Sequence, residues 1–226
     1  MLPTPTMLRP TTLPPRNRRA TAVSTKLRPA AALLPVLALL VACSSTPQPV
    51  QLYRLAAAPP ASAVAAAGAT TGTPAAVWQL VPPVRLPEYL DRDAILVPTG
   101  QSGLQALAGH RWAEPLRESV PRLLRQDLAT LLGESRVWGA PLPAGVVVTQ
   151  QLRVEVLALE PAPDRSAVTL QARWSVVDAA GKAPPRVDSA IIVAPAAAGT
   201  IDDLVAAHRL ALWRLAERIV GAAAGR

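Results

Sequence analysis

The chain has 226 residues, a formal net charge of +8 and a single cysteine, Cys43. Six basic residues and no acidic residue precede Cys43; from Cys43 onward there are 17 Lys and Arg against 15 Asp and Glu, a net charge of +2. The basic excess therefore belongs to the leading segment and gives no argument for a nucleic-acid partner. A single cysteine also excludes an internal disulfide.

The first 42 residues have the pattern of an export signal, with a basic region, an apolar run over residues 30–42 and a small residue at its end. As a helix, this run would cover only about 20 Å of a hydrocarbon core of about 30 Å. Residues 40–43 (Leu-Val-Ala-Cys) resemble the lipobox of bacterial lipoproteins. We predict that signal peptidase II cleaves between Ala42 and Cys43, and that lipid, including palmitate, is attached to Cys43.

The segment after the cut divides into two parts before the main domain. Residues 43–55 are predicted to be the lipidated N-terminus and a short first strand. Residues 56–76 are rich in Ala, Pro and Thr, and their prolines and glycines interrupt any helix. This composition predicts a flexible, exposed segment. The main domain is then residues 77–226.

The first half of the domain mixes strand and helix patterns. Short strands are predicted at 77–81, 94–97 and 104–108. Residues 113–132 place Leu and Val at spacings of three and four, which predicts an amphipathic helix. Pro115 suits its first turn, whereas Pro121 should bend the helix or delay its start. Gly133 is expected to end it.

The second half begins with strict alternation. Residues 152–156 and 168–176 alternate apolar and polar side chains across a short polar loop, which predicts an antiparallel hairpin, and 187–193 a third strand. A last amphipathic helix covers 204–220, capped by Thr200 or Asp202. Together the patterns predict an α+β fold, a two-layer domain with a mostly antiparallel sheet and two amphipathic helices packed on one face.

Residues suited to catalysis are few. The chain has two histidines, His110 and His208, and no G-x-S-x-G elbow for a serine hydrolase. The pair Asp202–Asp203 suits a helix N-terminus, and no clustered ligands suggest a metal. No glycine-rich phosphate loop is present. We expect no enzyme, no metal and no cofactor apart from the lipid on Cys43, and hence a binding or structural protein.

Two loop strings, residues 82–92 and 110–116, are more informative. Tyr, Trp and Arg are enriched among the residues that dominate protein interfaces. We therefore select four candidate partner-binding residues. They are Tyr89, Arg92, Arg111 and Trp112. Structural roles are the alternative, with Trp112 packing at the entrance of the first helix and Asp91–Arg92 closing a turn.

The same strings carry a resemblance to a known family. The lipobox followed by the sequences at 52–55, 84–92 and 111–116 resembles the ABC-type transport auxiliary lipoprotein family, whose best-known member is the paraquat-inducible lipoprotein. The similarity extends through residues 170–175 to the last helix. The inserted segment 56–76 and Pro121 depart from the family pattern.

The resemblance implies a docking protein without catalytic activity. Such proteins work beside an ABC permease complex and an MCE-type periplasmic protein that moves lipids or other apolar molecules between membranes, and a homo-oligomeric ring around that partner is expected. Ser44 after the cysteine implies the outer membrane, with the domain facing the periplasm. The alternative is an activator or assembly lipoprotein for another envelope machine, in cell-wall synthesis or lipopolysaccharide assembly.

Overall fold

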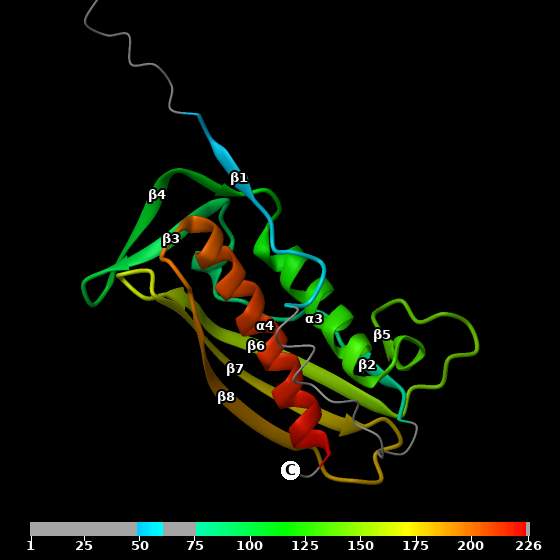
Figure 1. The fold of residues 1–226 in the computed structure, drawn as a ribbon. Coiled ribbons are helices and arrows are strands. Elements are labelled where there is room, and N and C mark those ends of the chain that lie inside the picture. The colour runs from blue at the N-terminus through cyan, green and yellow to red at the C-terminus, as the bar shows by residue number, and fades with distance from the viewer. Residues whose placement is uncertain (1–48, 61–75, 225–226) are drawn as a thin grey trace, which may run out of the picture. The chain divides into compact units, whose positions relative to one another are not determined.

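A computed structural model describes residues 49–60 and 76–224 (Figure 1). The predictions for the signal segment 1–42, for Cys43 and for residues 61–75 lie outside these ranges. Within them, none of the helices combines the length and hydrophobicity needed to cross a membrane.

A small sheet forms one end of the described structure. Its strands are β1 (Gln51–Tyr53), β4 (Gly103–Trp112) and β3 (Ala94–Thr99), in that spatial order. β1 runs parallel to β4, whereas β3 and β4 form an antiparallel hairpin. The predicted first strand therefore pairs with the domain. The strand predicted at 104–108 is longer than its hydrophobic pattern indicated, because the pairing with β1 extends β4 to Trp112.

A larger sheet has the order β5-β2-β6-β7-β8. The predicted hairpin is confirmed by β6 and β7, in which Val154 lies opposite Trp174. β2 runs parallel to both β5 and β6, so the strands form two mixed sheets where one mostly antiparallel sheet was predicted. The alternation of side chains marks a strand but does not encode its partner. The bounds are β2 (Trp78–Leu80), β5 (Val137–Trp138), β6 (Gln150–Pro161), β7 (Ala167–Asp178) and β8 (Arg186–Pro195).

Two long helices, α3 (Leu116–Leu132) and α4 (Ile201–Ala223), complete the α+β fold, with the short 3-10 helices η3 (Glu88–Leu90) and η4 (Glu134–Arg136). α3 begins at Leu116 because Pro115, in extended conformation, precedes its first turn. Pro121 lies inside α3, and the helix continues through it. Gly133 ends α3 with a φ of 110°, a conformation that favours glycine. The Thr200 hydroxyl accepts a hydrogen bond from the Asp203 N–H and caps α4.

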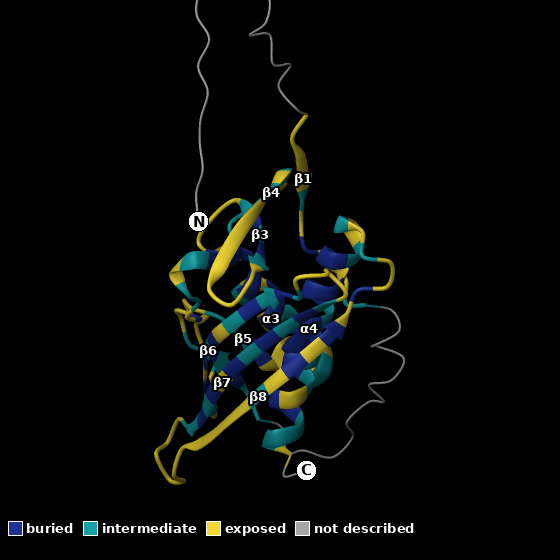
Figure 2. Cartoon of the chain, turned by 90° about the vertical axis from the view of Figure 1, so that its left-hand side faces the viewer, coloured by how far each residue is buried: buried dark blue, intermediate teal, exposed yellow. Residues whose placement is uncertain are grey.

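The core lies between the large sheet and the helices, as predicted. α4 packs against β7 and β8 and beside α3 (Figure 1). Buried residues alternate with intermediate or exposed ones along β6 and β7 (Figure 2). Leucines dominate the fully buried side chains, in agreement with a chain that has no Phe.

One ion pair is buried between the helices. Arg209 of α4 donates hydrogen bonds of 2.7 and 2.5 Å to the two carboxylate oxygens of Asp127 of α3. Burial raises the pKa of the Asp127 carboxyl, while the Arg209 hydrogen bonds and charge act in the opposite direction. The Arg209 Nε–H also donates to the Ala56 carbonyl at 2.8 Å. The pair thus fixes the chain after β1 to both helices.

Candidate functional site

The helices cover one face of the large sheet and leave the other open. We define the open face as the outward side of β6, β7 and β8. On β8 it carries three exposed apolar side chains, Val187 (73 % exposed), Ile191 (69 %) and Val193 (56 %). β8 is also the last strand of the sheet, so one of its edges has no neighbouring strand in the described structure. The open face is therefore more apolar than the polar outer face that alternation predicted.

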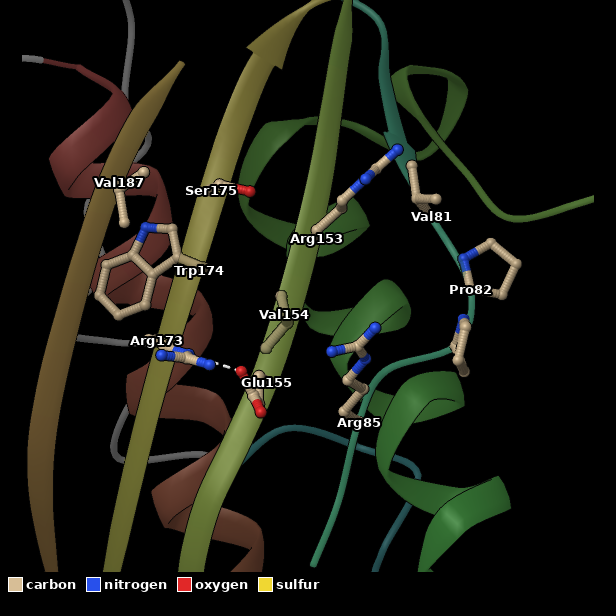
Figure 3. Close-up of a pocket in the computed structure, with 11 residues that line it drawn as sticks. Val81, Pro82, Arg85, Arg153, Val154, Glu155, Arg173, Trp174, Ser175 and Val187 are labelled. Carbon is tan, nitrogen blue, oxygen red and sulfur yellow. Dashed lines mark hydrogen bonds and ion pairs between the residues drawn. The ribbon is translucent and has the colours of Figure 1, made fainter.

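A concave site lies on the open face beside β2 (Figure 3). It has a volume of about 550 Å³, and we call it the basic groove. Arg153 and Glu155 of β6 and Arg173 of β7 form its floor, and Figure 3 shows them beside Arg85 on the same side of the sheet. Val81, Pro82, Pro83 and Val187 contribute apolar side chains to its walls, and Ser175 contributes a hydroxyl group.

Backbone pairing places the arginines of the groove. The chain after β2 continues along β6, where the Arg85 N–H donates to the Val154 carbonyl at 3.2 Å and the Val156 N–H donates to the Arg85 carbonyl at 2.8 Å. The hairpin register sets Arg173 opposite Glu155, and the Arg173 Nε–H donates to that carboxylate at 2.5 Å. Three arginines and one glutamate leave the groove with an excess of positive charge, which suits an anionic ligand.

The four residues selected from the sequence lie elsewhere, near the junction of β4, η3 and α3. Arg111 forms an ion pair with Asp93 at 2.5 Å, and Arg117 of α3 forms one with Asp91 at 2.7 Å. Tyr89 and Leu90 of one loop string and Trp112 and Leu116 of the other line the same small cavity, so the structure brings the two loop strings together. We call this exposed group the charged loop surface. It comprises Asp91, Arg92, Asp93, Arg111 and Arg117.

The two aromatic candidates are tied into the domain. Trp112 is 6 % exposed and packs edge-on against His208, with ring centroids 5.3 Å apart. Because so little of its surface is accessible, the structure favours for Trp112 the packing role that was its alternative. The Tyr89 hydroxyl donates to Glu160 at 2.9 Å. Burial, then the bond to Glu160 and its charge, raise the pKa of Tyr89 to about 12.

His208 has a structural environment. One ring nitrogen, Nδ1, lies 2.7 Å from the Leu204 carbonyl on the preceding turn of α4. Burial lowers the pKa of His208 to about 4. Among residues 49–60 and 76–224, no group of three or more His, Cys, Asp or Glu could hold a metal ion.

Sequence reasoning did not find the basic groove. The predicted alternation over 152–156 and 168–176 puts Arg153 and Arg173 on the polar side of their strands, whereas Arg85 fell within the loop string 82–92 and in fact pairs with β6. Their convergence depends on the pairing of three separate segments, and no local pattern encodes that pairing. The one available signal was the presence of arginines on both strands of the predicted hairpin.

Comparisons with known proteins agree on the family and the fold. Residues 53–220, from β1 to α4, match the family model described as the ABC-type transport auxiliary lipoprotein component. A crystal structure of an uncharacterized protein has a TM-score of 0.57 at 18 % identity, covering 76 % of this chain and 97 % of that chain. A protein from Xanthomonas campestris has a TM-score of 0.56 at 15 % identity, covering 76 % and 93 %. The search of curated proteins gave no significant match.

Proposed function

The chain belongs to the ABC-type transport auxiliary lipoprotein family, and from this premise we propose that it is a docking component, without catalytic activity, of an envelope transport system. The proposed partners are an ABC permease complex and an MCE-type periplasmic protein, and the proposed cargo is lipid or another apolar molecule. The observation that carries the proposal is the family match over residues 53–220, which spans the whole domain from β1 to α4.

The proposed location is the periplasmic side of the outer membrane, with the domain attached through lipid on Cys43. Ser44, the residue after Cys43, supports the outer membrane as the location, as the resemblance to the family implies. Lipid anchoring confines the protein and its partners to a thin layer, which raises their effective concentration, so that a modest interface suffices. A homo-oligomeric ring around a tunnel-shaped partner remains part of the proposal, since closed symmetric oligomers are common.

The charged loop surface is the proposed contact with this assembly. Arg92 is exposed and forms no ion pair within the described residues, so its charge is available to a partner. Arg111 lies beside it, oriented by Asp93. A charge at the rim of an interface mainly affects the rate of association, whereas reversal of its sign places like charges against each other and opposes binding.

Co-purification tests the proposal. The full-length, lipidated protein is expected to capture the ABC permease complex and the MCE-type protein from detergent-solubilised membranes. Arg92→Glu should abolish capture while the melting temperature stays within a few degrees of wild type. Arg136→Glu, the same change on the exposed η4, is the control. If Arg92→Glu and Arg111→Glu both fold and capture the complex normally, the charged loop surface is not the contact.

A further inference from the structure

A second cavity adjoins the basic groove. It has a volume of about 340 Å³ and lies between residues 82–83 and α3. The two cavities share Pro82 and Pro83 in their walls, so they lie on either side of this short segment. Leu80, Val84 and Pro121 line the second cavity, together with three arginines of α3, Arg117, Arg122 and Arg125. We call the two cavities together the basic tract.

The basic tract contains arginines that the domain does not neutralise. Arg117 pairs with Asp91 and Arg122 with Glu114, while Arg173 pairs with Glu155. Arg85, Arg125 and Arg153 are exposed and form no ion pair within residues 49–60 and 76–224. These three side chains come from the β2–η3 connection, α3 and β6. Since the chain from Cys43 onward is nearly neutral, the arginines of the basic tract form a local excess of positive charge.

The tract begins at Arg117, which also belongs to the charged loop surface, and extends to Arg153, at the end of β6 away from β1. Glu160 at one end of β6 contacts η3 through Tyr89, near β4 and β1, whereas Arg153 lies seven residues back along the strand, about 23 Å away. Figure 1 likewise places β1 and β2 at opposite ends. The seven residues between Cys43 and Gln51 span at most about 25 Å. β1, which follows these residues, is the described strand nearest to Cys43 in the sequence.

We infer that the basic tract binds an extended, acidic segment of a partner protein. Arginine guanidinium groups form bidentate pairs with carboxylates, through two parallel N–H···O hydrogen bonds. The exposed apolar side chains of Pro82, Pro83 and Val187 line the same cavities as the arginines and can receive apolar residues that alternate with the acids. A single lipid headgroup would fill one cavity, whereas a peptide chain can pass over Pro82–Pro83 and occupy both. The inference rests on the proposed function only in taking the partner from the transport assembly.

A peptide-binding measurement tests the inference with the full-length, lipidated protein in detergent. The probe is a fluorescein-labelled peptide of about ten alternating Glu and Leu residues, about 33 Å long when extended. The same peptide with Gln in place of Glu is the neutral control. We expect the acidic peptide to bind in a salt-dependent manner and the neutral one not to bind.

The variant Arg85→Glu/Arg153→Glu should weaken binding of the acidic peptide at least about tenfold. Its matched control is Arg136→Glu/Arg218→Glu, which makes the same change in net charge at two exposed positions outside the tract and should bind like wild type. Equal affinities for the two double variants would overturn the inference. The inference would also be overturned if Arg85→Glu/Arg153→Glu lost binding to vesicles containing phosphatidylglycerol but kept binding to the peptide.

Co-purification separates this inference from the proposed function. Suppose that the Arg85→Glu/Arg153→Glu variant captures the permease complex normally and binds the acidic peptide with unchanged affinity. This result would contradict peptide binding by the basic tract, but not the docking function. Suppose instead that the wild-type protein captures no permease complex but binds the acidic peptide through Arg85 and Arg153. This result would contradict the docking function and support acidic peptides as the ligand class of the tract.

Discussion

Among single residues, the buried pair Asp127–Arg209 is expected to have a large effect on stability, since the two side chains are 0 % and 3 % exposed. Removing one partner leaves an uncompensated charge in the interior, so Asp127→Ala should lower the free energy of unfolding by about 3–5 kcal/mol. Urea unfolding followed by tryptophan fluorescence measures this loss. The double variant Asp127→Leu/Arg209→Met removes both charges and should cost less than either single change to alanine.

His208 predicts a pH dependence of stability. Its pKa is about 4 in the folded protein and about 6.5 in the unfolded chain, so the unfolded state binds more protons between these values. The contribution to stability is complete above pH 6.5 and is lost as the pH falls toward 4, by about 3 kcal/mol in total. Across this range, the free energy of unfolding should depend less steeply on pH in His208→Gln than in the wild-type protein. His110→Gln is the control. If His208→Gln and the wild-type protein show the same slope, the pH dependence comes from the carboxylates and not from His208.

At the scale of elements, α4 depends on its N-terminal cap. The Thr200 hydroxyl accepts the Asp203 N–H at 3.1 Å, and the helix then packs against β7, β8 and α3. Thr200→Ala should destabilise the domain by about 1 kcal/mol because that N–H loses its partner. Thermal unfolding monitored by circular dichroism measures the change. Thr200→Ser keeps the hydroxyl and should retain most of the stability; a loss as large as that of alanine would contradict the capping role.

At the scale of the whole molecule, the proposed function requires attachment to a membrane. Cys43→Ala removes the only thiol of the chain, so we expect an unprocessed or soluble form in place of a membrane-bound one. Cell fractionation and intact-mass measurement distinguish these forms. Three acyl chains on Cys43 would make the attachment effectively permanent, because two lipid signals already suffice. An unmodified Cys43 peptide recovered from the wild-type membrane fraction would contradict the prediction.

The elements whose signals are local could be predicted from the amino-acid sequence. Alternation over 152–156 and 168–176 specified the β6–β7 hairpin, because a half-buried strand exposes every second side chain. The Leu and Val spacing in α3 and the glycine that ends it were equally readable, and the sequence narrowed the cap of α4 to Thr200 or Asp202. The strings at 52–55, 84–92 and 111–116 also carried the resemblance to the family that the match over residues 53–220 confirmed.

The tertiary structure alone decided which segments lie together. The parallel pairing of β1 with β4 and of β2 with β6 produced two mixed sheets, since a short strand carries no record of its neighbour. Trp112 became a core residue because α4 packs His208 against it. Arg85, Arg153 and Arg173 converge in the basic groove because the register of three segments sets them on one face. Such convergence depends on contacts between residues far apart in the chain, which no local pattern specifies.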